Sequence, residues 1–238
     1  MHQYPNLYSA TQDPFQVSTL FAAAKADGEL ARLLEASAHV WEGYTVEEHT
    51  LMVLNVFERY WARFFSTEDK EFWRLFLLLH DIGKQISVEK YGDKNRQHET
   101  TWPVMRDVFR AAKYDESQLC GAEALLDQDI LGEYFKDKIE LAEAVKSVRK
   151  VQQKCQWTAE EALYKIKVFF CCDAGGYTVF AGGSYSLDYL FAVDIEQATM
   201  ELADDLGKLR EHAEYQTLTP LQKYQFLQAA VLVDSTAE

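Results

Sequence analysis

The chain has 238 residues, 48% of them hydrophobic and 13% aromatic, so it is long and apolar enough to fold around a well-buried core. Its net charge of −14 disfavours a nucleic-acid polymer as a partner, because phosphate backbones bind to basic surfaces. The four cysteines fit no disulfide or zinc-knuckle spacing, and there is no leader-like start and no apolar run of 18 residues. We therefore expect a cytoplasmic protein that does not bind a membrane.

The N-terminal part of the chain is predicted to be helical after an extended lead-in. Residues 1–13 carry no period and form this lead-in, and two short helices follow, the second ending near His39. We interpret His39 as an ordinary histidine near a helix end. Thr45, with Glu48 three residues later, forms a capping box and starts a helix that is expected to reach about Phe65.

That helix carries His49 on its buried side, because apolar side chains follow it at i+3, i+4 and i+7. A second capping signal, Ser66 with Asp69, opens an apolar helix that runs into His80 and Asp81 and then breaks at a glycine. A histidine and an aspartate are costly to bury without a partner. A divalent cation is a suitable one, since imidazole and carboxylate are both good metal ligands.

The second half of the chain also reads as helical. Residues 115–155 predict two or three helices, the last running from Lys136 to about Cys155. A long acidic helix is expected from Asp194 to Tyr215, and Thr219-Pro220 is expected to cap a final amphipathic helix. Since no repeat or clear linker interrupts the chain, we expect one all-α domain over residues 1–238.

A further candidate ligand lies in this second half. The capping box of Thr158 with Glu161 starts a helix that ends at Asp173, and apolar neighbours turn this carboxylate inward. A single inward carboxylate also requires a cation. The sequence therefore predicts one divalent ion, whether Mn, Ni, Co, Zn, Fe or Mg, held by a set of four ligands. These are His49, His80, Asp81 and Asp173.

The order of these ligands resembles the HD-domain metal-dependent phosphohydrolase superfamily. The stretch GYTVEEHTLMVL is similar to the first-histidine helix of that family, and LLLHDIGK is similar to its doublet with the following glycine and lysine. The resemblance spans about residues 40–180. It implies an HD-like helical bundle over that range, with additional helices at both ends of the chain.

The resemblance also implies residues for substrate. Lys84 matches the lysine that the family places against a substrate phosphate, and His98 lies where many members have a histidine that contacts phosphate or a second metal. Arg96, in a basic stretch after the doublet, is either a substrate contact or part of a solvated loop. Tyr177 belongs to a glycine-rich stretch over residues 174–185, which is either a substrate lid, where a tyrosine can stack on a base, or a mobile connection.

These residues together predict the hydrolysis of a small phosphate ester by metal-activated water. The resemblance implies a nucleotide or a cyclic phosphodiester as the substrate class. Asp81 would orient the water, while Lys84 and His98 would offset charge on the phosphate. Only one histidine lies between the doublet and Asp173, which favours one metal over the two irons of the oxygenase branch. The first alternative is a catalytically silent HD module that binds a nucleotide or a protein partner. The second, which the sequence favours less, is a di-iron oxygenase of the same family. The oligomeric state is left open.

Overall fold

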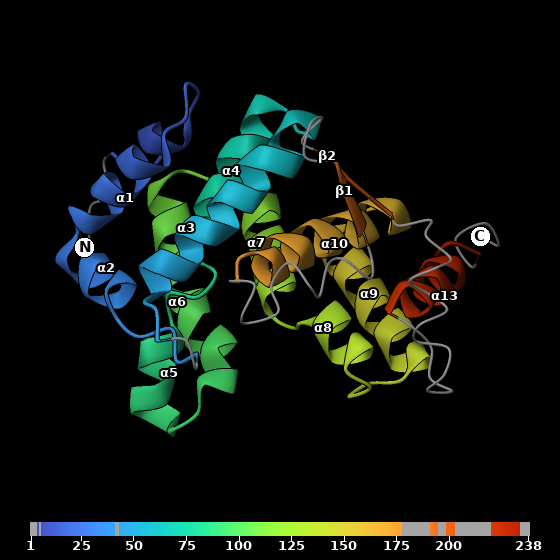
Figure 1. Cartoon of the computed structure of the whole chain (residues 1–238). Helices are drawn as coiled ribbons and strands as arrows, with labels where there is room; N and C mark the ends of the chain where they lie inside the picture. The colour runs from blue at the N-terminus through green and yellow to red at the C-terminus, as the bar shows by residue number, and fades with distance from the viewer. Residues whose placement is uncertain are drawn as a thin grey trace. The chain divides into compact units, whose positions relative to one another are not determined.

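The computed structural model describes residues 4, 6–40, 43–177, 191–194, 199–202 and 220–233. The chain divides into two compact units, Met1–Asp127 and Gln128–Glu238. Figure 1 shows that helices make up most of the described chain in both of them. The expected all-helical fold is therefore confirmed for the bulk of the chain, and the expected single domain stays a prediction.

The first unit is built from helices joined by short turns. It contains, in chain order, η1 (Ser9–Thr11), α1 (Val17–Lys25), α2 (Gly28–Leu34), α3 (Val46–Val56), η2 (Phe57–Trp61), η3 (Ala62–Phe64), α4 (Thr67–Leu79), α5 (Lys84–Tyr91), η4 (Lys94–Arg96), α6 (Gln97–Ala111) and α7 (Glu116–Leu126). Helices α3 and α4, which carry the predicted histidines, lie side by side (Figure 1).

The helix starts follow their local signals. Thr45 accepts a hydrogen bond from the Glu48 amide at 3.2 Å and its own amide donates to Glu48 Oε2 at 2.7 Å, so the predicted capping box is present. At the start of α4, Ser66 caps the Asp69 amide and donates its hydroxyl to the Asp69 carboxylate. The helix from Thr45 stays helical to Phe64, but through a π turn and a 3-10 turn after Val56.

Helix α4 is the core of the first unit, since every residue from Glu71 to Leu79 is buried. A helix buried on all sides must pair its polar groups, and Arg74 donates to Glu58 at 2.8 and 3.0 Å and to the Thr11 carbonyl at 2.7 Å. Arg74 also pairs with Asp13 at 2.8 Å. The described part of the lead-in, residues 4 and 6–13, thus contains the turn η1 and is attached to α4, whereas the sequence predicted an extended segment.

The second unit combines helices with a small hairpin. Its elements are α8 (Ile130–Phe135), α9 (Leu141–Cys155), α10 (Ala159–Gly175), β1 (Phe191–Asp194), β2 (Thr199–Leu202) and α13 (Pro220–Val233). The final helix starts at Pro220 as predicted, whereas the helix predicted from Lys136 starts only at Leu141. Within this unit α13 packs against α8 and α9, and its buried Lys223 donates to the Phe135 carbonyl at 3.1 Å.

The acidic helix predicted from Asp194 to Tyr215 is wrong where the structure describes it. Strands β1 and β2 pair there as an antiparallel hairpin, with Phe191 opposite Leu202 and Asp194 opposite Thr199. Helix propensity is a weak preference that strand pairing overrides. Most of the glycine-rich stretch, residues 178–185, lies outside the described residues. Among the described helices, none combines the length and the apolar character needed to cross a bilayer.

Candidate metal centre

His49 lies fully buried in the first turn of α3. The capping box at Thr45 and Glu48 fixes where α3 begins, and so fixes the direction in which the His49 imidazole points. The ring of Tyr44 stacks on the imidazole with the centroids 6.2 Å apart and the planes 11° from parallel. The start of α3 therefore fixes His49 in two ways, through the capping box and through the stacked Tyr44 ring.

His80 and Asp81 follow the last residue of α4 and are each only 2% exposed. His80 Nδ1 lies 2.6 Å from the Leu77 carbonyl oxygen. Because a carbonyl can only accept, Nδ1 carries the proton and Nε2 carries a lone pair. Histidines that bind a metal through one ring nitrogen typically donate a hydrogen bond from the other, because this bond fixes the orientation and the tautomer of the ring.

The donor atoms of these residues converge. His49 Nε2 lies 3.4 Å from His80 Nε2 and 3.3 Å from Asp81 Oδ2, and His80 Nε2 lies 3.6 Å from Asp81 Oδ2. Two atoms bound tetrahedrally to one ion at about 2.1 Å are separated by about 3.4 Å. Two imidazole nitrogens and one carboxylate oxygen that converge at these separations in a buried position form a donor set that fits a divalent ion.

Asp81 has further partners that hold its carboxylate in place. The buried Lys84 ammonium contacts Oδ2, and the Gln97 amide donates to Oδ1 at 2.9 Å. Gln97 comes close because the first turn of α6 is fastened to the turn after the doublet. The Gly83 amide donates to Thr101 Oγ1 at 3.0 Å, and Thr100 Oγ1 donates to the Gly83 carbonyl at 2.8 Å.

Asp173, the remaining predicted ligand, lies half-buried near the end of α10 in the second unit. In the same unit Asp129 caps the start of α8, and its carboxylate accepts a hydrogen bond of 2.9 Å from the Gly132 amide. Desolvation, and after it the negative charge of Asp173, raises the pKa of Asp129. The second unit thus holds two aspartates in electrostatic contact, and the role of Asp173 as a ligand stays a prediction.

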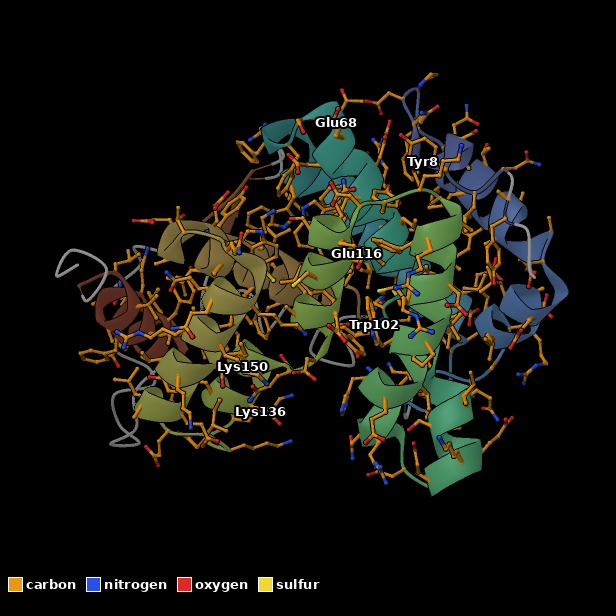
Figure 2. The ribbon with its side chains drawn as sticks, turned by 180° about the vertical axis from the view of Figure 1, so that it is seen from behind. Tyr8, Glu68, Trp102, Glu116, Lys136 and Lys150 are labelled. Carbon is orange, nitrogen blue, oxygen red and sulfur yellow. The ribbon has the colours of Figure 1, made fainter. Side chains whose placement is uncertain are left out.

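The predicted substrate residues have different surroundings. Arg96 makes two bonds of 2.8 Å to Glu99, and its guanidinium lies 3.8 Å from the ring centroid of Tyr91. The Arg96 guanidinium lowers the pKa of Glu99 to about 2. His98 lines a cavity of about 180 Å³ with side chains of α6 and α7, among them Trp102, which is labelled in Figure 2. Tyr177 lies half-buried just beyond α10 in the second unit.

Two neighbours of the site were not singled out from the sequence, Tyr44 and Gln97. Tyr44 directly precedes the Thr45 cap. An aromatic residue at this position often packs against the first turn of the helix, so the sequence could have indicated its contact with His49. Gln97 directly precedes His98, and the structure shows that Gln97 is the α6 side chain bonded to Asp81. No local pattern marks it, because the contact depends on how α6 approaches the doublet.

Comparison with known proteins adds one finding. The family model of the HD domain matches residues 46–166, which include His49, His80, Asp81, Lys84 and His98 and stop short of Asp173. No curated protein and no solved structure matches the chain. The resemblance drawn from the short motifs is thereby confirmed by a pattern that extends far beyond them. Since the match spans more than half of its length, the chain belongs to the HD domain family.

Proposed function

We propose that this protein is a metal-dependent phosphohydrolase that uses water to cleave a small phosphate ester, either a phosphomonoester or a cyclic phosphodiester, with a nucleotide as the substrate class. One observation carries the proposal: the donor atoms of His49, His80 and Asp81 converge in a buried position at separations that suit a single ion. Membership of the HD domain family supports the same chemistry.

The ligand set contains imidazole and carboxylate donors, which suit Mn, Fe, Co, Ni or Zn and less well Mg. Asp173 is proposed as the fourth ligand on the strength of the motif order. When bound, the ion supplies a Lewis acid that lowers the pKa of water and polarises a phosphoryl oxygen. One ion is proposed, since only His98 lies between the doublet and Asp173 in sequence to supply another imidazole.

Lys84 is proposed to stabilise the negative charge that builds on the phosphoryl oxygens. It is buried, so its ammonium acts with little screening by water, and it contacts the carboxylate of Asp81. Asp81 would thereby contact both the metal ion and the Lys84 ammonium that binds the phosphate. We propose that Asp81 also accepts a hydrogen bond from the attacking water, which orients it toward phosphorus.

The remaining substrate contacts are proposed from the family resemblance and from position. Arg96 uses Nε and Nη2 for Glu99, and a guanidinium has further N–H donors for a phosphate. His98 is proposed to contact phosphate, and Tyr177 to stack on a base. A net charge of −14 repels polyanions, so local cations of this kind are expected to select a small phosphorylated ligand.

The test combines metal content with turnover. Protein purified without chelator is analysed for metals, then assayed with bis(p-nitrophenyl) phosphate, p-nitrophenyl phosphate, nucleoside monophosphates and cyclic nucleotides under Mn, Ni, Co and Mg. Asp81→Asn is compared with Asp107→Asn, a matched control whose carboxylate is exposed and pairs only with the neighbouring Arg106 among the contacts described.

About one metal per chain and measurable hydrolysis, both lost in Asp81→Asn and both kept in Asp107→Asn, would support the proposal. Two irons per chain with oxygen-dependent turnover would replace it with the oxygenase chemistry. Metal without hydrolysis of any substrate in the panel would point to a catalytically silent module that binds its ligand.

A further inference from the structure

Gln97 is the first residue of α6, and its side chain reaches the carboxylate of Asp81. The bond runs from Gln97 Nε2 to Asp81 Oδ1 and measures 2.9 Å. The other carboxylate oxygen, Oδ2, is the one that lies 3.3 Å from His49 Nε2 and 3.6 Å from His80 Nε2. Gln97 and the two histidines therefore contact opposite oxygens of the same carboxylate.

The orientation of the Gln97 amide follows from this contact. An ionised carboxylate only accepts hydrogen bonds, so the amide nitrogen must face Asp81 and the amide oxygen must face away from it. That oxygen, Oε1, is buried, and it has no hydrogen-bond partner among the residues that the structure describes. A buried carbonyl oxygen without a donor is costly, so we expect a group that enters the site to donate a hydrogen bond to it.

The position of Gln97 is itself well fixed. Thr100 and Thr101, in the first turn of α6, bond to both the carbonyl and the amide of Gly83. A Cβ atom on Gly83 would lie 2.3 Å from the Thr101 backbone nitrogen, so this glycine permits the close approach of the helix. The backbone that carries Gln97 is thus tied to the backbone that carries Asp81.

We propose that Gln97 is a positioning residue of the metal centre, which holds Asp81 with Oδ2 turned toward the two imidazole nitrogens. Its Oε1 accepts a hydrogen bond from an O–H group that enters the site, supplied by water or by substrate. The inference rests on the proposed metal binding and assigns no role in bond breaking to Gln97. Contacts that orient a ligating carboxylate typically change metal affinity by 10–100-fold when they are removed.

The test is Gln97→Met, which keeps the length of the side chain and removes both the donor and the acceptor. The matched control is Gln85→Met, because Gln85 is also a half-buried glutamine, and its amide bonds to His39 and Glu89 instead of a predicted ligand. The dissociation constant for Mn²⁺ or Co²⁺ is measured by competition with a chromophoric chelator, and the visible absorption of bound Co²⁺ reports the ligand geometry.

We expect Gln97→Met to weaken Mn²⁺ and Co²⁺ binding by about 10–100-fold and to alter the Co²⁺ spectrum, while Gln85→Met leaves both unchanged. At saturating metal, loss of the Oε1 contact is expected to lower kcat by about tenfold. Unaltered metal affinity in folded Gln97→Met overturns the positioning role, and an unaltered kcat at saturating metal overturns the role of Oε1. If Gln97→Met fails to fold, Gln97→Asn, which is too short to reach Asp81, serves in its place.

The wild-type protein separates this inference from the proposed function. If the wild type binds Co²⁺ but hydrolyses nothing, and Gln97→Met weakens that binding, hydrolysis is refuted and the positioning role stands. If the wild type hydrolyses its substrate and Gln97→Met matches it in affinity and rate, the positioning role is refuted and the proposed function stands. If the wild type binds neither Mn²⁺ nor Co²⁺, both are refuted.

Discussion

Lys84 shows how one residue can be tested apart from the metal. Its ammonium is buried and contacts Asp81, which is a predicted ligand, so it could support the ion or the substrate. If it stabilises charge on the phosphate, Lys84→Met should lower kcat/KM by about 10²–10³ and leave about one metal per chain. Elemental analysis and kinetics on the same sample decide between the two roles, since loss of metal together with activity would assign Lys84 to the ion.

The pair of Arg96 and Glu99 yields a prediction about pH. Arg96 holds the pKa of Glu99 at about 2, below the ordinary value of 4.5, because two hydrogen bonds favour the ionised carboxylate. A pKa that is depressed in the folded state contributes stability above pH 4.5, and this is lost as the pH falls toward 2. NMR titration of Arg96→Gln should show the Glu99 pKa rising toward 4.5. A Glu99 pKa already near that value in the wild type would refute the pair.

Gly83 is needed for the space it leaves rather than for its backbone angles, since its φ is −88°. In Gly83→Ala the new Cβ would lie 2.3 Å from the Thr101 backbone nitrogen, and backbone yields poorly. We expect a loss of about 1–3 kcal/mol in the free energy of unfolding, measured in urea, and weaker metal binding as α6 is displaced. Gly28→Ala is the control, because a Cβ there meets nothing within 4 Å. Equal stability of both variants would contradict the close packing.

At the scale of the elements, Arg74 attaches the N-terminal segment to α4. It is 2% exposed, pairs with Glu58 and Asp13, and donates to the Thr11 carbonyl. Arg74→Leu leaves Glu58 and the buried Thr11 carbonyl without this donor, while Asp13 keeps its pair with Lys70, so we expect a loss of about 1–3 kcal/mol in the free energy of unfolding. Arg106→Leu, which removes an exposed pair with Asp107, should cost under about 1 kcal/mol. Proteolysis within residues 1–16 should become faster in Arg74→Leu alone.

Elements differ in how far the sequence predicts them, for physical reasons. Helices that begin at Thr45 and Thr158 were predictable because a capping box is made by residues three apart. The hairpin of β1 and β2 was not, since Glu201 and its neighbours favour a helix locally and only strand pairing reverses that preference. The contact of Gln97 with Asp81 could not be predicted from the sequence for a related reason, because this hydrogen bond forms only when α6 packs against the turn after α4.

At the scale of the whole molecule, the predicted ligands come from distant parts of the chain. His49, His80 and Asp81 lie in the first unit, and Asp173, proposed from the motif, lies in the second. An ion that binds the folded chain alone stabilises it by about 2.7 kcal/mol at a concentration 100 times its dissociation constant. For a chain of this length, that corresponds to a rise of about 5–10 °C in the unfolding temperature.

Calorimetry with and without Mn²⁺ or Co²⁺ measures this rise, and removal by chelator should reverse it. Asp81→Asn is expected to show almost no shift, because it removes the negative charge of the carboxylate whose Oδ2 lies 3.3 and 3.6 Å from the two imidazole nitrogens. Asp173→Asn should show an intermediate shift if Asp173 contributes one ligand of four, since three donors retain weaker binding. A shift in Asp173→Asn as large as that of the wild type would exclude Asp173 from the ligand set, and an equal shift in Asp81→Asn would show that the ion binds elsewhere.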